Sequence, residues 1–208
     1  MATIGLSRPY FAKYNYDEET RTVYYSDGGL MGRFTELSLD LNDGDDNILY
    51  ADNAPAESDK NFSGGTVKIT TDDLSAVVML PVLGLKSEAI GLDDVSTEDA
   101  KWIVYDDDQA IPYVGIGGII KKRVRGIIKW VGVIFEKTQF SNPGISAVTQ
   151  AKTIEWQTST LSASIMRGDN DKHSWHRITS ELNTEAEADA AVRAFLGIKS
   201  TSNDEVTT

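Results

Sequence analysis

The sequence predicts a mainly β protein of 208 residues with two helices. Polar and apolar residues alternate from Glu36 to Leu41 and again from Thr66 to Thr70, which is the pattern of strands with one buried face. In residues 113–135, two apolar stretches flank the basic turn KKRVRG, an arrangement typical of a β-hairpin. No linker rich in Gly, Ser or Pro divides the chain, so residues 1–197 are expected to form one domain.

Further strands are predicted on both sides of these segments. Near the N-terminus, Tyr10, Ala12 and Tyr14 alternate with polar or partly polar neighbours. A second strand, residues 21–25, follows the acidic turn at residues 17–19. The first 41 residues are therefore expected to be β structure.

The second half of the chain is expected to be β from Lys101 to about Met166. The turn-forming cluster Ser141–Gly144 separates two of these strands. The later strand begins at Lys152, and its buried face is expected to carry Ile154 and Trp156.

Two segments have helical patterns. The first is Thr71–Leu83, for which Thr71 or Asp72 can serve as the cap. Gly84 follows as a stop signal, and Pro81 weakens the last turn. We therefore expect a short helix directly after the strand that ends near Thr70.

The second helix, residues 184–196, begins with the capping box Thr184-Glu185-Ala186-Glu187 and stops at Gly197. Residues 198–208 are predicted to be a mobile polar tail. Four apolar residues recur at helical spacing and are expected to pack on the strands. They are Ala188, Ala191, Val192 and Phe195.

A long acidic insert, residues 42–65, separates the two alternating strands. Connections beyond roughly 15 residues are uncommon in compact domains unless they are functional or disordered. Its apolar residues argue against disorder, so the sequence predicts an arm that contacts a partner. The residues assigned to this assembly arm are Asp43, Asp45, Asp46, Ile48, Leu49, Tyr50 and Phe62.

Composition excludes several classes of protein. Thirty-two acidic and twenty basic residues give a formal charge of −12, which argues against binding the phosphate backbone through a basic surface. Without cysteine, neither disulfides nor thiolate chemistry are possible, and a reducing cytoplasm suits the chain. The N-terminus lacks the basic and apolar regions of a signal peptide, and no apolar run reaches the length of a membrane span.

The patterns that suggest ligand chemistry are weak. DLNDGDD, residues 40–46, is rich in oxygen ligands, but Gly44 is one position early for a calcium loop and Glu57 is too distant. The glycines of residues 115–118 are not followed by a helix, so they favour a bulge or close packing over dinucleotide binding. For residues 40–46, a solvated turn or an interface is therefore favoured over an ion site, and no cofactor or metal is expected.

The remaining polar clusters are also expected to be structural. His173 and His176 have no cysteine or carboxylate at ligand spacing, and no hydrolase or nucleotide-binding motif occurs. The acidic triplet Asp106–Asp108 ends a strand, where carboxylates are usually solvated, although an acid–base pair is an alternative. The four tryptophans are expected to anchor the core or an interface. No enzymatic activity is predicted.

Several stretches, taken together and in order, closely resemble the major tail protein, or tail tube protein, of long-tailed bacteriophages that infect Gram-positive bacteria. The resemblance covers about residues 1–196. It departs from the family at Pro81, in the expected helix, and in the polar tail. The stretches are IGLSRPYFAKYN, LDLNDGDDNILYADNAPAESDKNFSGG, WIVYDDDQAIPYVGIG, TQFSNPG, TIEWQT and IMRGDNDKHSWHR.

The resemblance implies an antiparallel β-sandwich or barrel, flanked by an α-helix and carrying a C-terminal helix. It also implies rings of six subunits that stack into a tail tube, through which the genome passes into the host. The implied partners are further copies of the chain and the tape-measure, tail-terminator and tail-tip proteins, with no membrane. DNA would pass without specific binding, and the protein would belong to the virion tail after assembly in the host cytoplasm.

In such a tube, the polar faces of the predicted strands line either the lumen or an outer, solvated surface. Glu36, Asp40 and Glu155 are the candidates for a lining that repels DNA, and Lys68 is an exception that a neighbouring acid can neutralise. The alternative function is a monomeric β-sandwich binding module for carbohydrate or a cell-surface ligand. A hydrolase with clustered acids is a weaker third possibility.

Overall fold

The computed structural model describes residues 2–43, 47–51, 54–59, 62–72, 74–90, 101–144 and 158–199. It confirms a mainly β fold with antiparallel pairing and a C-terminal helix. The strands of the first half are β1 (Ala2–Asp17), β2 (Thr22–Leu30), β3 (Phe34–Asp43), β4 (Asn47–Ala51), β5 (Ala54–Asp59) and β6 (Phe62–Thr71). The other elements are α1 (Ala76–Leu83), β7 (Lys86–Ala89), β8 (Lys101–Val104), β9 (Tyr113–Val124), β10 (Ile127–Phe140), β11 (Ser159–Met166), β12 (His176–Ile178) and α2 (Glu185–Phe195).

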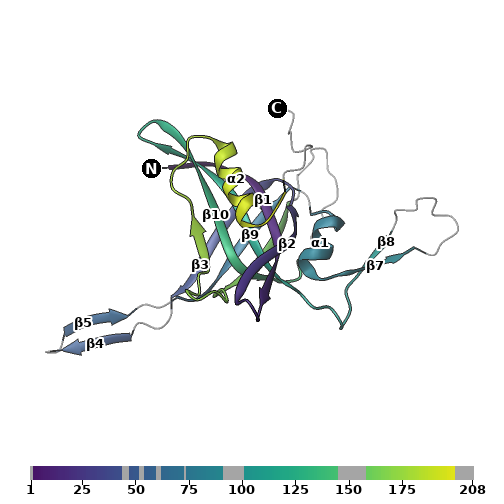
Figure 1. Cartoon of the computed structure of the whole chain (residues 1–208), viewed down its shortest axis with the longest axis horizontal. Helices are drawn as coiled ribbons and strands as arrows, with labels where there is room; N and C mark the ends of the chain where they lie inside the picture. Colours follow the sequence, from purple (N-terminus) through teal and green to yellow (C-terminus); the bar gives the residue numbers. More distant parts are fainter. Residues whose placement is uncertain are drawn as a thin grey trace, which may run out of the picture.

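The main sheet curls into a barrel (Figure 1). Its strand order is β2-β1-β9-β10-β11-β6-β3, and β12 pairs with β10 beside the end of β11. β2 and β3 stand at opposite ends of this order, yet only residues 31–33 connect them. A flat sheet cannot satisfy that connection, so the two ends must approach each other. The backbone amide of Met31 donates to the carbonyl of Pro9, 2.8 Å away, where the connection meets β1.

The predicted hairpin is the centre of this barrel. β9 and β10 pair from Val124 and Ile127 at the turn to Tyr113 and Gln139 at the other end. Val114 and Ile116 of β9 are buried in the main core. The intervening Gly115 and Gly117 face α2, because a Cβ at Gly117 would lie 2.5 Å from a methyl carbon of Val192. The prediction that these glycines permit close packing is therefore confirmed.

Helix α2 lies against the outside of the barrel, over β9 and β10 (Figure 1). Its predicted capping box is present: Thr184 accepts from the amide of Glu187, whose carboxylate accepts from the amide of Thr184. A small second core joins the helix to β1 and β10. It contains Tyr10, Ala12, Ile134, Val192 and Leu196.

Asp189 is a buried charge on the inner face of α2 that the apolar pattern did not predict. It is 5% exposed. Its carboxylate accepts a 2.7 Å hydrogen bond from the hydroxyl of Tyr10 and forms ion pairs with Arg8 (3.4 Å) and Arg193 (3.1 Å). The cost of burying the carboxylate is thus offset by one hydroxyl and two guanidinium groups.

The first helix differs from the prediction. Thr71 is the last residue of β6 and pairs with both β3 and β11, while α1 begins only at Ala76 after Ser75. Asp72 does not cap the helix, because its carboxylate accepts from the backbone amide and the Nε of Arg33. The predicted stop is confirmed: Gly84 has φ +64, and its amide donates to the carbonyl of Leu80.

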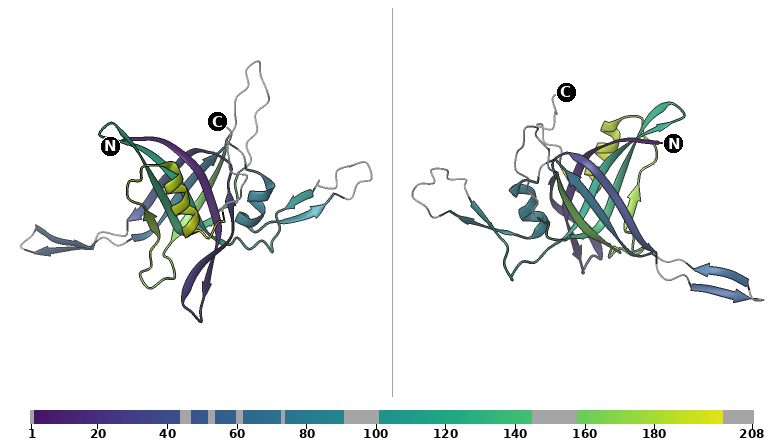
Figure 2. Two further views of the ribbon diagram at one scale, coloured as in Figure 1. Left: turned by 45° about the horizontal axis from the view of Figure 1, so that its top comes forward. Right: turned by 180° about the vertical axis from the view of Figure 1, so that it is seen from behind.

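Two small hairpins project from the barrel, β4–β5 at one side and β7–β8 at the other (Figure 2). The predicted strand from Lys152, with Ile154 and Trp156, lies outside the described residues, as do residues 200–208 of the predicted tail. Neither helix in the described part of the chain combines the length and apolar character needed to cross a membrane.

The buried tyrosines predict a loss of stability at alkaline pH. Burial, followed by the hydrogen bond to Asp189, raises the pKa of Tyr10 to about 12, and burial also raises the pKa of Tyr14 to about 12. An unfolded tyrosine titrates near ~10. The stabilisation is therefore complete below about pH 10 and is lost as the pH rises towards about 12.

Urea unfolding across this range tests the prediction, with a Tyr10→Phe/Tyr14→Phe variant as the comparison. The free energy of unfolding of the variant should fall less steeply with pH than that of the wild type, since lysines titrate equally in both. Equal slopes for the two proteins would contradict it.

Candidate functional site

The ribbon formed by β3 and β6 extends into the predicted arm. The two strands pair from Phe34 opposite Thr71 to Asp43 opposite Phe62. Residues 42–43 and 62–65 of the predicted insert therefore belong to the main sheet, because backbone pairing continues through them. The insert is shorter than predicted, and β4 and β5 form a separate hairpin beyond its root.

The predicted arm residues occupy different positions. Asp43 ends β3, whereas Asp45 and Asp46 lie outside the described residues. Ile48 and Leu49 lie on β4, opposite Ser58 and Glu57. Tyr50 follows them on β4, at a register shift opposite Pro55.

Phe62 belongs to the barrel and not to the arm. Its ring stacks on Trp175 with 4.1 Å between ring centroids and 3° between ring planes, and both rings pack on the main core. Arg167 also donates to the carbonyl of Phe62, 2.6 Å away. These contacts fix the point at which the ribbon leaves the barrel. Because Trp175 is 113 residues away in sequence, local patterning gave no signal of this pair.

The outer face of β3, β6 and β11 forms a polar wall. On each strand, polar residues alternate with residues that point to the core, such as Val67 on β6 and Leu161 on β11. The hydroxyls of Thr70 and Thr160 are 3.0 Å apart across two strands. The wall consists of Glu36, Ser38, Asp40, Thr66, Lys68, Thr70, Thr160, Ser162 and Ser164.

Two of the predicted lumen candidates lie on this wall. Glu36 and Asp40 are exposed on β3, while Glu155 lies outside the described residues. The Nζ of Lys68 is 3.7 Å from the carboxylate of Asp40, so the expectation that a neighbouring acid balances this lysine is confirmed. The described wall therefore carries mainly hydroxyl groups, a balanced pair and Glu36.

β3 is the last strand of the sheet order and has no hydrogen-bonded neighbour on its outer edge within the described residues. Its inward side chains are incompletely covered, with Leu39 36% and Leu41 44% exposed. Sequence alternation predicted the apolar face of this strand but not its edge position, which depends on the topology of the whole sheet. An uncovered edge of this kind is a template for pairing with another chain.

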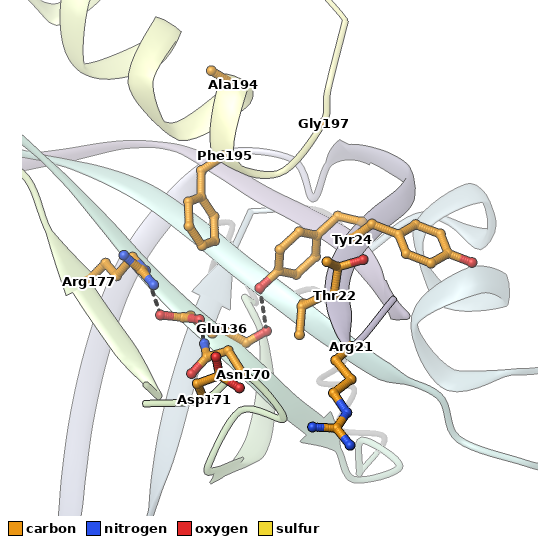
Figure 3. A pocket seen from close by; sticks show the side chains of 12 residues that line it. Arg21, Thr22, Tyr24, Glu136, Asn170, Asp171, Arg177, Ala194, Phe195 and Gly197 are labelled. Atoms are coloured by element: carbon orange, nitrogen blue, oxygen red, sulfur yellow. Dashed lines mark hydrogen bonds and ion pairs between the residues drawn. The ribbon is translucent and has the colours of Figure 1, made fainter. Parts of the chain in front are cut away.

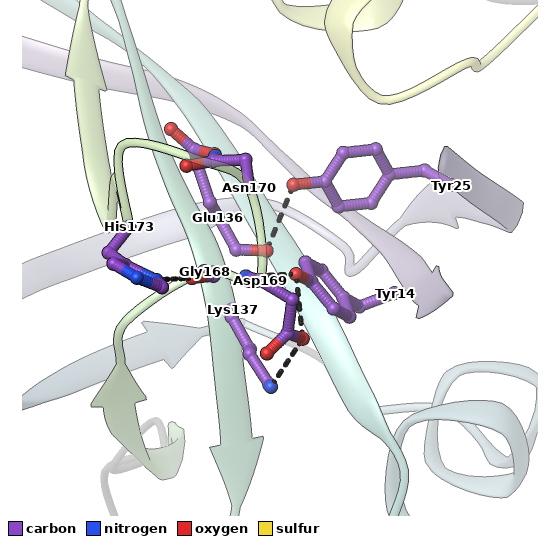
Figure 4. Close-up of polar contacts among 8 residues, drawn as sticks. All are labelled: Tyr14, Tyr25, Glu136, Lys137, Gly168, Asp169, Asn170 and His173. Carbon is purple, nitrogen blue, oxygen red and sulfur yellow. Dashed lines mark hydrogen bonds and ion pairs between the residues drawn. The ribbon is translucent and has the colours of Figure 1, made fainter. Parts of the chain in front are cut away.

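A polar cluster lies at the end of the barrel below α2 (Figure 4). Glu136 of β10 is 2% exposed, and its carboxylate accepts from the Nε of Arg177 (2.6 Å) and the Nδ2 of Asn170 (3.1 Å). Its backbone carbonyl accepts from the hydroxyl of Tyr25, 3.0 Å away. Burial raises the pKa of Tyr25, and the negative charge of Glu136 adds to this effect.

The same cluster holds the loop of residues 167–175 against the barrel. The carboxylate of Asp169 pairs with the Nζ of Lys137 at 2.6 Å and accepts from the hydroxyl of Tyr14 at 3.0 Å. The Nδ1 of His173 is 3.0 Å from the carbonyl oxygen of Gly168 (Figure 4). These interactions use the polar groups of the segment to fix its backbone.

The two histidines have different environments. His176 stacks between Phe135 and Trp175, with centroid distances of 5.0 and 5.2 Å, and burial lowers its pKa. His173 instead bonds to the loop backbone, as described above. Among the described residues, no group of three or more His, Asp or Glu side chains is arranged to hold a metal ion.

An open pocket of about 560 Å³ lies between β2, the loop and the end of α2 (Figure 3). Its aromatic walls include Phe195, whose ring lies 5.5 Å from that of Tyr25 and 5.1 Å from the Arg177 guanidinium carbon. Arg21 and Asp171 add charged groups at the rim. Because Glu136 is occupied by Arg177 and Asn170, the pocket has no uncommitted buried carboxylate among these lining groups.

Comparison of the sequence with models of known protein families gave no match, and comparison with curated proteins gave none either. The site that combines an exposed edge, a polar wall and a projecting arm is the β3–β6 ribbon, whereas the groups around Glu136 satisfy one another.

The Glu136–Arg177 pair predicts an asymmetric effect on stability. Arg177→Ala leaves the buried carboxylate of Glu136 without its cation and should lower the free energy of unfolding by about 2 kcal/mol. Glu136→Gln should cost less, about 1 kcal/mol, because the half-exposed Arg177 can return to water. Urea unfolding near neutral pH measures both changes.

The double variant, Glu136→Gln with Arg177→Ala, is the control for coupling. It should lose less stability than the sum of the two single variants, because removing the charge relieves the unpaired carboxylate. Additive losses would show that the pair does not interact as the geometry indicates.

Proposed function

We propose that this protein is a structural subunit of a bacteriophage tail tube, which forms rings of six that stack into a conduit for the genome. The observation that carries the proposal is the β3–β6 ribbon. It presents a polar wall and an unpaired, partly apolar strand edge, and it continues towards a projecting hairpin. The sheet order also ends at β2, so the β3 edge of one copy can pair with a different surface of the next copy, a heterologous contact that can close into rings.

The β4–β5 hairpin supports a role in assembly. Its backbone pairs only within the hairpin in the described residues, and it projects from the barrel (Figure 2). The Phe62–Trp175 stack anchors its root. Ile48, Leu49 and Tyr50 give β4 apolar content that a solvated loop does not require. We assign this hairpin to contacts with a neighbouring copy or ring.

The polar wall supports a lumen through which DNA slides. Duplex DNA carries one charge per ~1.7 Å of axis, so weak attraction to each subunit would sum to a large drag over many rings. The described wall offers no excess of cations, because Asp40 balances Lys68 and Glu36 adds a negative charge. Hydroxyl and carboxylate groups therefore give a surface to which phosphates do not adhere.

A tail tube has to be started, set to a defined length and closed, and each step needs another protein. Its partners are the tail-tip, tape-measure and tail-terminator proteins, and its place is the tail of the virion after assembly in the host cytoplasm. The proposed role is structural rather than enzymatic and uses no cofactor.

One observation favours a second candidate, a monomeric binding module. The pocket beside α2 combines aromatic rings with Asp171 and two arginines, a lining compatible with a carbohydrate or a cell-surface ligand. Negative-stain microscopy and light scattering of the purified protein separate the two functions. Rings or tubes support the tube subunit, whereas a persistent monomer with glycan affinity supports the module.

Replacing residues 44–61 by a short Gly-Ser turn should yield a folded protein that does not form tubes. The replacement leaves the β3–β6 pairing and Phe62 intact, so the barrel keeps its anchor. Circular dichroism checks folding, and microscopy checks assembly. Normal tubes from the shortened protein would rule out the arm as an assembly element.

Charge reversal on the wall should slow genome release. Particles with Glu36→Lys, Asp40→Lys and Glu155→Lys should assemble but release DNA more slowly at low salt, and the defect should fade as salt rises. A matched control reverses three exposed acids off the wall, Glu88→Lys, Asp171→Lys and Glu181→Lys. Normal release at low salt from the triple variant would contradict the assignment of the wall to the lumen.

A further inference from the structure

The turn of the β9–β10 hairpin, residues 121–129, forms a basic finger. It carries five cations and no acid. The rest of the chain has thirty-two acidic and fifteen basic residues, a formal charge of −17. The finger is thus a locally basic segment, with five cations in nine residues, in an otherwise acidic chain. These cations are Lys121, Lys122, Arg123, Arg125 and Lys129.

The finger has a defined backbone. β9 and β10 pair up to Val124 opposite Ile127, and Arg125 and Gly126 make the turn with φ +50 and +84. β1 adds a third strand along the finger, with Gly5 opposite Lys121 and Ala2 opposite Arg123. The finger projects beyond the barrel on the side where the chain begins (Figure 1).

Charge in the finger is not balanced within the described residues. Lys122 and Lys129 are directly opposite each other across the two strands, an arrangement that is destabilising for like charges. Lys129 donates to the side-chain oxygen of Asn183, and Lys121 lies 5.0 Å from the ring centroid of Trp130. Hydrogen bonds with Thr184 and Asn183, and to a smaller extent the charge of Lys129, lower the pKa of the nearby Glu187, whose carboxylate already accepts two bonds at the start of α2.

The tip of the finger is also apolar. Ile127 is 62% exposed and Ile128 is 41% exposed, beside Arg123 and Arg125 on the same turn. Adjacent exposed isoleucines among cations indicate a contact surface, because exposed apolar patches mark interaction sites and a basic surface favours an acidic partner.

The opposite end of the barrel carries complementary charge. β1 runs for sixteen residues from beside Arg123 of the finger to the acidic β1–β2 turn, roughly 50 Å of strand. Glu18 and Glu19 are exposed in that turn, and Asp107 is exposed in the connection that precedes β9. Within the described residues none of these three acids forms an ion pair, whereas Asp106 and Asp108 pair with Lys86.

We infer that the basic finger of one copy docks on the acidic end of the next copy along the stack, an inference that rests on the proposed function. The two surfaces lie at opposite ends of one barrel, so their contact is heterologous and repeats without closing, as a tube requires. The opposite charges of the two ends give the stack a direction, because two basic fingers would repel each other and so would two acidic ends. The apolar tip contributes contact area that is insensitive to salt.

Two complementary variants test this contact. The finger variant carries Lys122→Glu, Arg123→Glu and Arg125→Glu, and the acid variant carries Glu18→Lys, Glu19→Lys and Asp107→Lys. Each alone should form rings but about tenfold fewer tubes than the wild type, because every junction then places like charges together. Mixed in equal amounts, they should restore tubes of alternating rings, which negative-stain microscopy and sedimentation detect.

A matched control reverses three exposed lysines away from the finger, Lys101, Lys172 and Lys199, each to Glu. It has the same change in net charge and should assemble normally. Rescue on mixing also shows that both variants fold. If a variant is unfolded by circular dichroism, the glutamine version of the finger variant replaces it and should shift tube formation to lower salt.

The remaining outcomes overturn the inference in distinguishable ways. Normal tubes from the finger variant overturn it and leave the proposed function standing, whereas a wild type that stays monomeric overturns both. Loss of tubes without rescue on mixing assigns the finger to another role. Salt-sensitive retardation of a short DNA duplex by the wild type, abolished in the finger variant, would identify that role as nucleic-acid binding.

Discussion

The short connection between β2 and β3 is the constraint on which the rest of the structure depends. Three residues join strands that lie at opposite ends of the sheet order, so the sheet has to curl. Met31 of this connection is fully buried in the main core, and Arg33 beside it binds Asp72 at the end of β6. The curl brings the terminal strands β2 and β3 towards each other, leaves the outer edge of β3 without a hydrogen-bonded strand in the described residues, and turns the polar faces of β3, β6 and β11 outward. The polar wall, the β3 edge and the root of the arm are therefore all consequences of the curl that the β2–β3 connection imposes.

The outside of the barrel accommodates α2 because three positions lack side chains. A Cβ at Gly115, Gly117 or Gly132 would lie within 3 Å of Tyr25 or of side chains of the α2 segment. The missing side chains allow Val192 and Leu196 to contact the strands. Asp189 lies on the same inner face of α2 and is therefore buried as well. The inward carboxylate is tolerable because β1 supplies Tyr10 and Arg8 on the facing surface.

Features set by local patterning were predictable from the sequence, whereas features set by distant partners were not. The alternating strands, the β9–β10 hairpin, the capping box at Thr184 and the stop at Gly84 all have signals within a few residues. The residues around Thr71 predict a helix that Thr71 could cap. Backbone pairing of Thr71 with β3 and β11 outweighs that local preference. The sequence places Phe62 in the arm, because nothing near Phe62 in the sequence indicates that its ring stacks on Trp175. The polar wall was partly predicted, since Glu36 and Asp40 follow from alternation, while the hydroxyls of β11 required the sheet order.

The continuity of β3 and β6 with the arm has a mechanical consequence. Both strands leave the barrel at the same end, so tension on the arm pulls them along their own length. β6 is held on its other side by β11 through the pairs from Ser159–Thr71 to Ile165–Gly65. Hydrogen bonds in such a ladder lie across the strands, so a lengthwise pull loads them in shear and together rather than one at a time. The attachment of the arm therefore resists tension along the strands, the direction in which a β-sheet is stiffest.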